Sequence, residues 1–235
     1  MSLLTIIQTV APRFGIPAPS IAASSTDQNV VQLTAFVNEA GQELAKRHSW
    51  QALTNEATFT TLATEIQGTL TTLTGADYSF IVNETMWNRT QRRPVFGPKS
   101  PAEWQQLKAQ TLQGPWQQYR IRGNNILFLP APAAGQSIYF EWVSQNWVTT
   151  ATATTANVMT ADTDVSKLEE RLLALDTVWR FQAAKKLDYT ESFNKAEEAI
   201  SDAITRDGPK PRLQLEGSGT DILPVVVVPS GNWGV

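Results

Sequence analysis

The spacing of apolar residues changes along the chain, and this change constrains the fold more than any other feature. Between residues 27 and 47 apolar side chains recur every three or four positions, the period of a helix with one buried face. Residues 137–142 alternate apolar and polar side chains instead, as a half-buried strand does. Because the helical period returns after residue 164, the sequence predicts an α+β fold. We expect a bundle of N- and C-terminal helices with an antiparallel β-rich region inserted between them.

Four helices are predicted outside the β-rich region, at residues 2–10, 27–47, 164–186 and 190–207. The third is apolar on two faces, since one stripe runs through Leu172 and Leu175 and a second comprises Leu173, Val178 and Phe181. A helix with two apolar faces must be covered on two sides. We therefore expect a neighbouring copy of the chain to cover Leu173, Val178 and Phe181, as lateral contacts of a ring.

Within the β-rich region, strands are predicted at residues 58–74, 78–82, 119–122, 125–129 and 137–142. Gly123 and Asn124 can supply the positive φ angles of a tight hairpin turn between two of them. One short helix is expected to begin at Ser100-Pro101-Ala102-Glu103, which combines a capping box with a proline at the first helical position. Residues 149–163 are predicted to form a connector with little to pack.

These patterns predict four segments: N-terminal helices at 1–53, a β-rich insertion at 54–148, C-terminal helices at 149–208 that pack on the N-terminal ones, and an extended arm at 209–235. Prolines and glycines hinder helix formation in the arm. Its valine run can add a strand to a partner's sheet, or it can complete the chain's own β-rich region. The arm residues expected to bind the portal or another partner are Pro209, Lys210, Arg212, Leu223, Val225, Val226, Val227, Val228 and Trp233.

The composition excludes several classes of protein. The chain has no cysteine and one histidine, which excludes disulfides, thiolate sites and histidine-rich metal clusters. The formal net charge of −3 argues against a globally basic nucleic-acid binder. Neither a signal peptide nor a membrane-spanning segment is recognisable, so we expect synthesis in a reducing cytoplasm and no membrane contact.

Candidate residues for chemistry are few. As a catalytic base His48 would need an orienting carboxylate and a nucleophile, and it follows two cations, so we interpret it as a helix-ending residue. Asp162 and Asp164 resemble the opening of a calcium loop, but Lys167 stands where that loop needs glycine. We interpret both carboxylates as caps of the long helix. The sequence predicts no catalytic residue, no metal site and no cofactor.

A basic loop is formed by Arg89, Arg92, Arg93 and Lys99, which are interleaved with aromatic residues. Such a loop can contact the backbone of a nucleic acid or an acidic partner surface. The alternative is an exposed loop whose cations pair locally.

Two stretches of the chain resemble a known family. In Glu43–Gln51 a helix ends in Lys46-Arg47-His48-Ser49-Trp50 directly before a threonine-rich strand, and Lys167–Asp207 contains a long helix with the sequence Trp179-Arg180-Phe181-Gln182-Ala183-Ala184. In these features the chain resembles the head-to-tail adaptors of short-tailed bacteriophages, the tail tubular protein A or portal-bound tail accessory factors.

The resemblance implies a structural virion protein without enzymatic activity, made in the host cytoplasm and placed at the head–tail junction. It implies a ring, usually of twelve copies, that lies between the portal and the tail nozzle and lines the channel for translocating DNA, with non-specific DNA contact. Two alternatives stay open: another neck or tail-completion ring protein, and a cell-wall hydrolase that uses carboxylates. The absence of convergent acidic residues in the sequence argues against the hydrolase.

Overall fold

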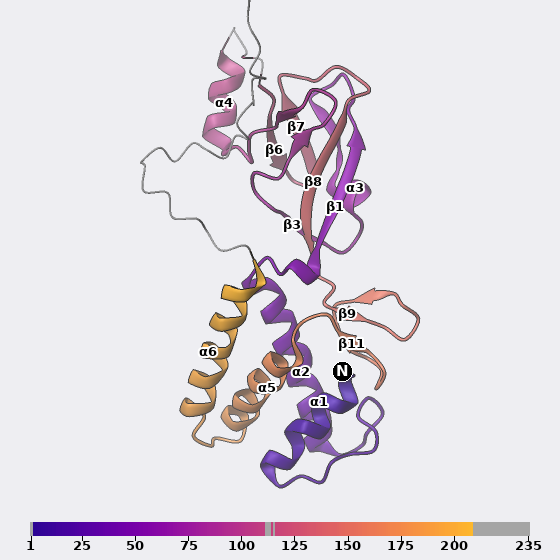
Figure 1. Ribbon diagram of the computed structural model, residues 1–235, viewed down its shortest axis with the longest axis vertical. Helices are drawn as coiled ribbons and strands as arrows, with labels where there is room; N and C mark the ends of the chain where they lie inside the picture. Colours follow the sequence, from indigo (N-terminus) through magenta and orange to yellow (C-terminus); the bar gives the residue numbers. More distant parts are fainter. Residues whose placement is uncertain (1, 111–113, 115, 209–235) are drawn as a thin grey trace, which may run out of the picture.

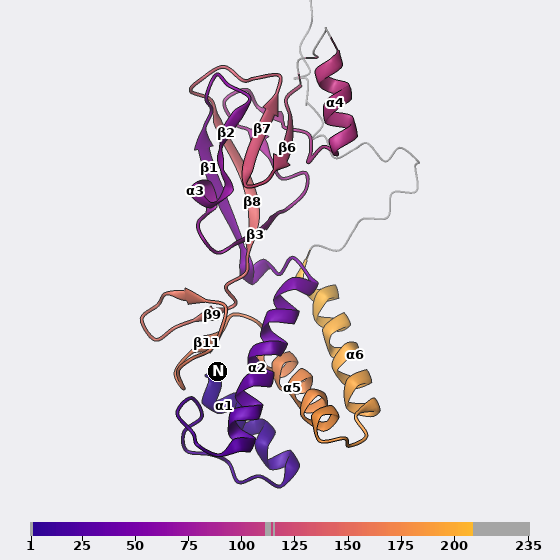
Figure 2. The same cartoon turned by 180° about the vertical axis from the view of Figure 1, so that it is seen from behind.

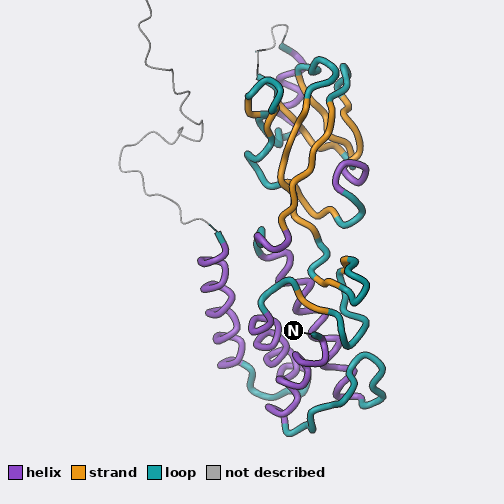
Figure 3. Tube along the Cα trace, turned by 45° about the vertical axis from the view of Figure 1, so that its right-hand side comes forward, coloured by secondary structure: helices purple, strands orange, loops and turns teal. Residues whose placement is uncertain are grey.

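Two separate apolar cores organise the structure, one among helices and one among strands. The computed structural model describes residues 2–110, 114 and 116–208. The two cores lie at opposite ends of an elongated molecule, which narrows to a waist where the segment after α2 (Gln28–Arg47) and the segment after β8 (Ser137–Ser144) cross (Figure 1). Most of the helices lie at one end of the molecule and most of the strands at the other (Figure 3).

The helical end is built from both ends of the described chain, which confirms the predicted fold class. Besides α2, its elements are α1 (Leu3–Val10), the 3-10 helix η1 (Ala11–Phe14), α5 (Glu170–Ala184) and α6 (Thr190–Asp207). The side chain of Ser2 accepts a hydrogen bond from the Thr5 N–H and caps α1, and Asp27 caps α2 by accepting from the Asn29 N–H at 2.9 Å. These caps satisfy backbone donors that a helix cannot pair internally, so the two helices begin where the sequence predicts.

Helix α5 is largely buried by elements of its own chain, from Leu172 to Phe181. Leu173, Val178 and Phe181 are 0%, 7% and 3% exposed. The Phe181 ring lies 4.5 Å from that of Phe14 and meets Phe36 edge-on, at 6.5 Å between centroids. The expectation that a neighbouring copy covers these three side chains is therefore wrong, because η1 and α2 already fill the second apolar face.

The β end contains two antiparallel sheets that enclose the second core (Figure 2). The larger sheet has the order β1-β8-β4-β5, and β3 also pairs with β8; the smaller has the order β2-β7-β6. In the larger sheet Ala57 lies opposite Phe140 and Phe59 opposite Ile138, so the apolar sides of β1 and β8 face the same core. The strands are β1 (Thr54–Thr60), β2 (Ile66–Thr69), β3 (Tyr78–Ile81), β4 (Trp87–Asn88), β5 (Arg93–Pro94), β6 (Gln118–Arg122) and β7 (Asn125–Leu129).

Local signals at the β end are confirmed with one exception. The β6–β7 hairpin turns at Gly123, whose φ is 60°, and α4 (Pro101–Ala109) carries the predicted capping box. The exception is the second half of the strand predicted at 58–74, where residues 70–74 form the short helix α3 (Leu70–Thr74). Thr69 caps this helix by accepting from the Thr72 N–H, and such side-chain bonds compete with a sheet ladder.

The segment between β8 and α5 packs more closely than predicted. It forms a small sheet of β9 (Val148–Thr149), β10 (Thr155–Ala156) and β11 (Val165–Ser166). Met159 is 1% exposed in the helical core, and its N–H donates to the Asn38 side chain at 2.7 Å. The prediction of a connector with little to pack is wrong, because long-range contacts to α2 hold this segment.

Asp162 and Asp164 do not cap α5, which begins at Glu170 rather than at residue 164. The Asp162 carboxylate accepts from the backbone N–H groups of Ala22 and Ala23, at 2.9 and 2.7 Å. Asp164 accepts from the N–H groups of residues 160 and 161. Each carboxylate therefore fixes a loop, and the prediction that they cap the long helix is wrong. The predicted arm, with Val225–Val228 and Trp233, lies outside the described residues.

Candidate interaction surfaces

The described residues show no arrangement suited to metal chemistry. No group of three or more histidine or acidic side chains in this part of the chain could hold a metal ion. His48 lies at the waist, where its Nε2 is 3.4 Å from the Asp207 carboxylate and its ring packs edge-on against Trp50. None of the helices in the described ranges has the length and apolar character that a membrane span requires.

An acidic face lies on α2, organised by one arginine of α5. Arg180 is 7% exposed and donates to Asp176 at 2.9 Å, to Glu39 at 2.6 Å and to Glu43. Burial lowers the pKa of Arg180, but the hydrogen bonds to Asp176 and Glu43 outweigh burial and raise it overall. One guanidinium thus serves three carboxylates, and this leaves an excess of negative charge. Glu39 and Glu43 carry that excess outward, since their side chains are 59% and 51% exposed.

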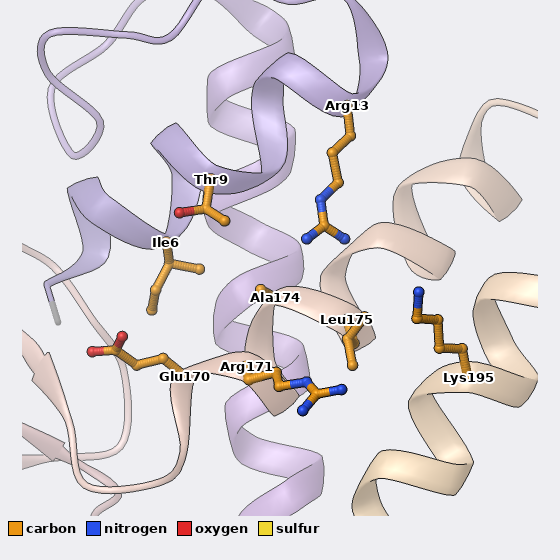
Figure 4. A pocket seen from close by; sticks show the side chains of 8 residues that line it. All are labelled: Ile6, Thr9, Arg13, Glu170, Arg171, Ala174, Leu175 and Lys195. Atoms are coloured by element: carbon orange, nitrogen blue, oxygen red, sulfur yellow. The ribbon is translucent and has the colours of Figure 1, made fainter.

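A cationic pocket of about 320 Å³ opens between α1, η1, α5 and α6 (Figure 4). Its cations come from three elements: Arg13 from η1, Arg171 from α5 and Lys195 from α6. Within the described chain, none of these three side chains has a hydrogen-bond or ion-pair partner. The remaining lining residues are Ile6, Thr9, Glu170, Ala174 and Leu175.

The cationic pocket and the acidic face lie on opposite sides of α5. Arg171 and Arg180 are nine residues apart, which is two and a half turns at 3.6 residues per turn. Their side chains therefore leave the helix in opposite directions. Arg171 reaches the pocket, and Arg180 reaches Glu39 and Glu43 on α2.

The residues of the predicted basic loop differ in their contacts: some are held by neighbouring side chains, and others face solvent. Arg89 forms an ion pair with Glu56 and lies 3.5 Å above the Tyr139 ring. Arg93 lies over the Trp116 ring at 5.5 Å, and Arg92 is exposed in a left-handed conformation with φ of 57°. Lys99 is half-buried. The loop is thus held by aromatic rings and one local pair, and it retains cations that face solvent.

An exposed apolar corner lies at the turn between α5 and α6. The Trp179 ring meets Phe193 edge-on at 5.3 Å and lies 6.2 Å from Tyr189. Leu187 and Tyr189 are 53% and 44% exposed. Grouped apolar exposure of this kind is typical of a surface that contacts another protein.

A groove of about 480 Å³ runs beside β3, at the base of the β end. Its lining is mostly apolar and includes Tyr78, Phe80 and Ile121. Strand β3 pairs with β8 on one edge, and no described strand pairs with its other edge. The Asp207 carboxylate accepts from the Gln51 N–H at 2.9 Å, so α6 ends at the waist, close to the Ser49 side of this groove.

Sequence reasoning missed the cationic pocket, the acidic face and the apolar corner. The pocket residues are spread from position 6 to position 195, so no local pattern could group them. Arg180 carried a usable signal, because an arginine between Trp179 and Phe181 in an apolar helix needs a buried partner.

The chain matches the model of a known family. The model of the family described as SU10 adaptor protein matches residues 1–213. This range includes both ends of the helical bundle and the whole β end, and it stops before the valine run of the arm. No curated protein matches the chain.

Proposed function

The chain belongs to the SU10 adaptor protein family, and from this premise we propose that twelve copies form a ring between the portal and the tail nozzle. Family membership identifies a structural head-to-tail adaptor in the neck of a bacteriophage virion, where it associates with the portal and the tail. The ring, its copy number and its lining of the DNA channel are our proposals.

The separation of the molecule into two ends carries this proposal. A connector must present different surfaces to two neighbours, and the helical and β ends have separate cores and separate surfaces (Figure 3). The waist joins two distinct apolar clusters, with Val143 of β8 in the helical one, and each end can meet its own neighbour. The net charge of −3 per copy would limit adhesion of DNA that passes through the ring.

The experiment that tests the proposal is imaging of the neck in purified particles of the phage that encodes the chain. Expected is a closed ring of this chain between portal and nozzle, with density for both ends of each copy. Deletion of its gene should give DNA-filled heads without tails, and supply of the gene from a plasmid should restore tails. Tailed, infectious particles that lack the chain would overturn the proposal.

The arm at 209–235 is proposed to bind the portal, because its valine run can pair with a sheet edge of a partner. The rival is the chain's own groove beside β3, since α6 ends close to it. Truncation after Gly208 separates the two. Loss of attachment to portal-bearing heads with unchanged melting supports a portal-binding arm, whereas a lowered melting temperature of the β end supports the groove beside β3.

The basic loop is proposed to face an acidic neighbour or the DNA channel. Reversal of Arg92 and Arg93 to glutamate should slow docking, and more so at low salt, because exposed charges are screened over about 8 Å at physiological ionic strength. Arg89→Glu is the matched control, since Arg89 already pairs with Glu56 and stacks on Tyr139. Docking that is unchanged across a salt series would identify the loop as a solvated surface.

A further inference from the structure

We propose that the cationic pocket of one copy binds the acidic face, Glu39 and Glu43, of the next copy, as the lateral contact of the ring. This inference rests on the proposed ring and names the surfaces that close it. It replaces the lateral contact expected at Leu173, Val178 and Phe181, which the chain covers itself.

The pocket has the chemistry of a carboxylate site. Arg13, Arg171 and Lys195 converge from three elements and have no partner in the described chain (Figure 4). Glu170 is the one carboxylate among the lining residues, so the pocket keeps an excess of positive charge that an anion from outside would stabilise. Arginine also offers a planar fork of donors that fits a carboxylate in a bidentate manner.

The floor of the pocket favours a glutamate side chain over DNA phosphate. Ile6, Ala174 and Leu175 also line the cavity, and Leu175 lies among the three cations (Figure 4). A glutamate carries two methylene groups below its carboxylate, which can pack on this apolar floor while the charge meets the cations. A phosphodiester backbone binds mainly through charge and gains little from an apolar floor.

The acidic face has the complementary property. Arg180 neutralises only part of the charge of Asp176, Glu39 and Glu43, and the last two are more than half exposed. A carboxylate offers about four acceptor positions, so each can bind a second cation while it keeps Arg180. Glu39 and Glu43, which carry the surplus negative charge, can therefore bind the pocket of a neighbouring copy.

The geometry of α5 makes this contact a ring contact. The two surfaces lie on opposite sides of α5, so one copy cannot join them within itself. Contact between two different surfaces is heterologous, and it generates a ring when the rotation between copies closes. Each copy then uses its pocket toward one neighbour and its acidic face toward the other.

Disulfide trapping tests the contact directly, because the natural chain has no cysteine. The variant Lys195→Cys/Glu39→Cys is incorporated into phage particles, which are then oxidised and separated on a denaturing gel without reductant. A ladder of covalent oligomers is expected. The matched control is Lys195→Cys/Asn83→Cys, in which the second cysteine replaces an exposed residue of the β end and should give monomer alone.

A charge swap provides the second measurement. Arg13→Glu/Arg171→Glu should lower the number of adaptor copies per particle by at least about tenfold, since like charges would then face each other. Adding Glu39→Arg/Glu43→Arg to the same chain should restore occupancy, because every copy carries both exchanged surfaces. Calorimetry of each purified variant checks that the fold is retained. The cysteine variant tests the same contact without the charge swap, and in that variant Arg180 keeps its partners Glu43 and Asp176.

The outcomes separate this inference from the proposed function. Rings that are present in the neck but give no ladder, or that tolerate the charge reversal, overturn the inference and leave the ring intact. Rings of normal occupancy whose reversed pocket alters only DNA retention would assign the pocket to phosphate and also overturn it. Absence of the chain from the neck overturns the proposed function itself.

Discussion

The helical end and the β end bury polar groups in different ways. In the helical end, a charged pair, Arg180 and Asp176, lies inside the core region and is completed by exposed glutamates of α2. In the β end, three buried amide side chains form a neutral network: Asn88 donates to Gln136 at 2.7 Å and to Gln117 at 3.1 Å. The neutral network is satisfied within its own core, whereas the charged one depends on surface side chains. The helical end is therefore the end where binding of a partner can change stability.

The two ends are connected by more than the chain itself. Trp147, which follows β8, leaves the β end and packs in the helical core with 0% exposure. It lies against Gly41 of α2, where an added Cβ would overlap the indole ring. Its Nε1 also donates to the Asn157 carbonyl at 2.9 Å. This one side chain fixes the exit of β8 to α2.

The largest expected effect is that of Trp147→Ala. Loss of a fully buried tryptophan should lower the free energy of unfolding of the helical end by about 3–5 kcal/mol, because it removes apolar contacts and leaves a cavity against Gly41. Thermal unfolding followed by calorimetry and by near-UV circular dichroism measures it.

Phe128→Ala is the matched variant in the β end, where Phe128 is 0% exposed. This variant should lower the free energy of unfolding by a similar amount, but only for the β end. If both variants shift one common transition equally, the two ends unfold as one unit, and the separation of two cores would not reflect separate stability.

The second prediction concerns the buried charge. Arg180→Met should destabilise the helical end by about 3 kcal/mol, because Asp176 would remain 5% exposed without its cation. The double variant Asp176→Asn/Arg180→Met removes the stranded charge and should recover part of the loss. Chemical denaturation at neutral pH measures both variants. Equal destabilisation of the single and double variants would show that lost packing, rather than the charge, is responsible.

Much of the fold follows from local signals in the sequence. The starts of α1 and α2, the capping box of α4 and the turn at Gly123 are each encoded within a few residues, and each appears where predicted. The strand prediction is wrong for residues 70–74, because the β-propensity of a threonine run favours a strand there. In the structure Thr69 and Thr74 form hydrogen bonds with the local backbone, and these bonds stabilise a helical turn. Strands of two residues, such as β9–β11, are set by distant contacts that no local pattern contains.

The surfaces were less predictable than the fold. The two apolar stripes of α5 correctly indicate that two sides need covering, but the sequence period does not say which chain covers them. The structure assigns both to the same copy, through contacts such as Phe181 with Phe14. The cationic pocket joins Arg13 to Lys195, residues that only the packing of α1 and α6 on α5 brings to one cavity.

A smaller effect is expected from the neutral network of the β end. Asn88→Ala should cost about 2 kcal/mol, because Gln117 and Gln136 would lose a buried partner. Unlike the loss in Arg180→Met, this loss should not change between low and high salt, since no charge is involved. Denaturation at two ionic strengths compares the variants. A salt-dependent loss in Asn88→Ala would remove the distinction between the two ends.

The smallest expected effect is at α4, in which Glu103 closes the capping box by accepting from the Ser100 N–H at 2.8 Å. Hydrogen bonds from Ser100, first from its backbone and then from its side chain, lower the pKa of Glu103 below its ordinary value. Because the folded-state pKa is the lower one, this stabilisation is present above the unfolded pKa of about 4.3 and is lost as the pH falls through the folded value. Hydrogen-exchange protection in the first turn of α4 should therefore decrease in acid below about pH 4. The control Glu103→Gln keeps an acceptor but cannot titrate, so its protection should stay level over the same range, and an equal decrease in both proteins would place the acid-sensitive group elsewhere.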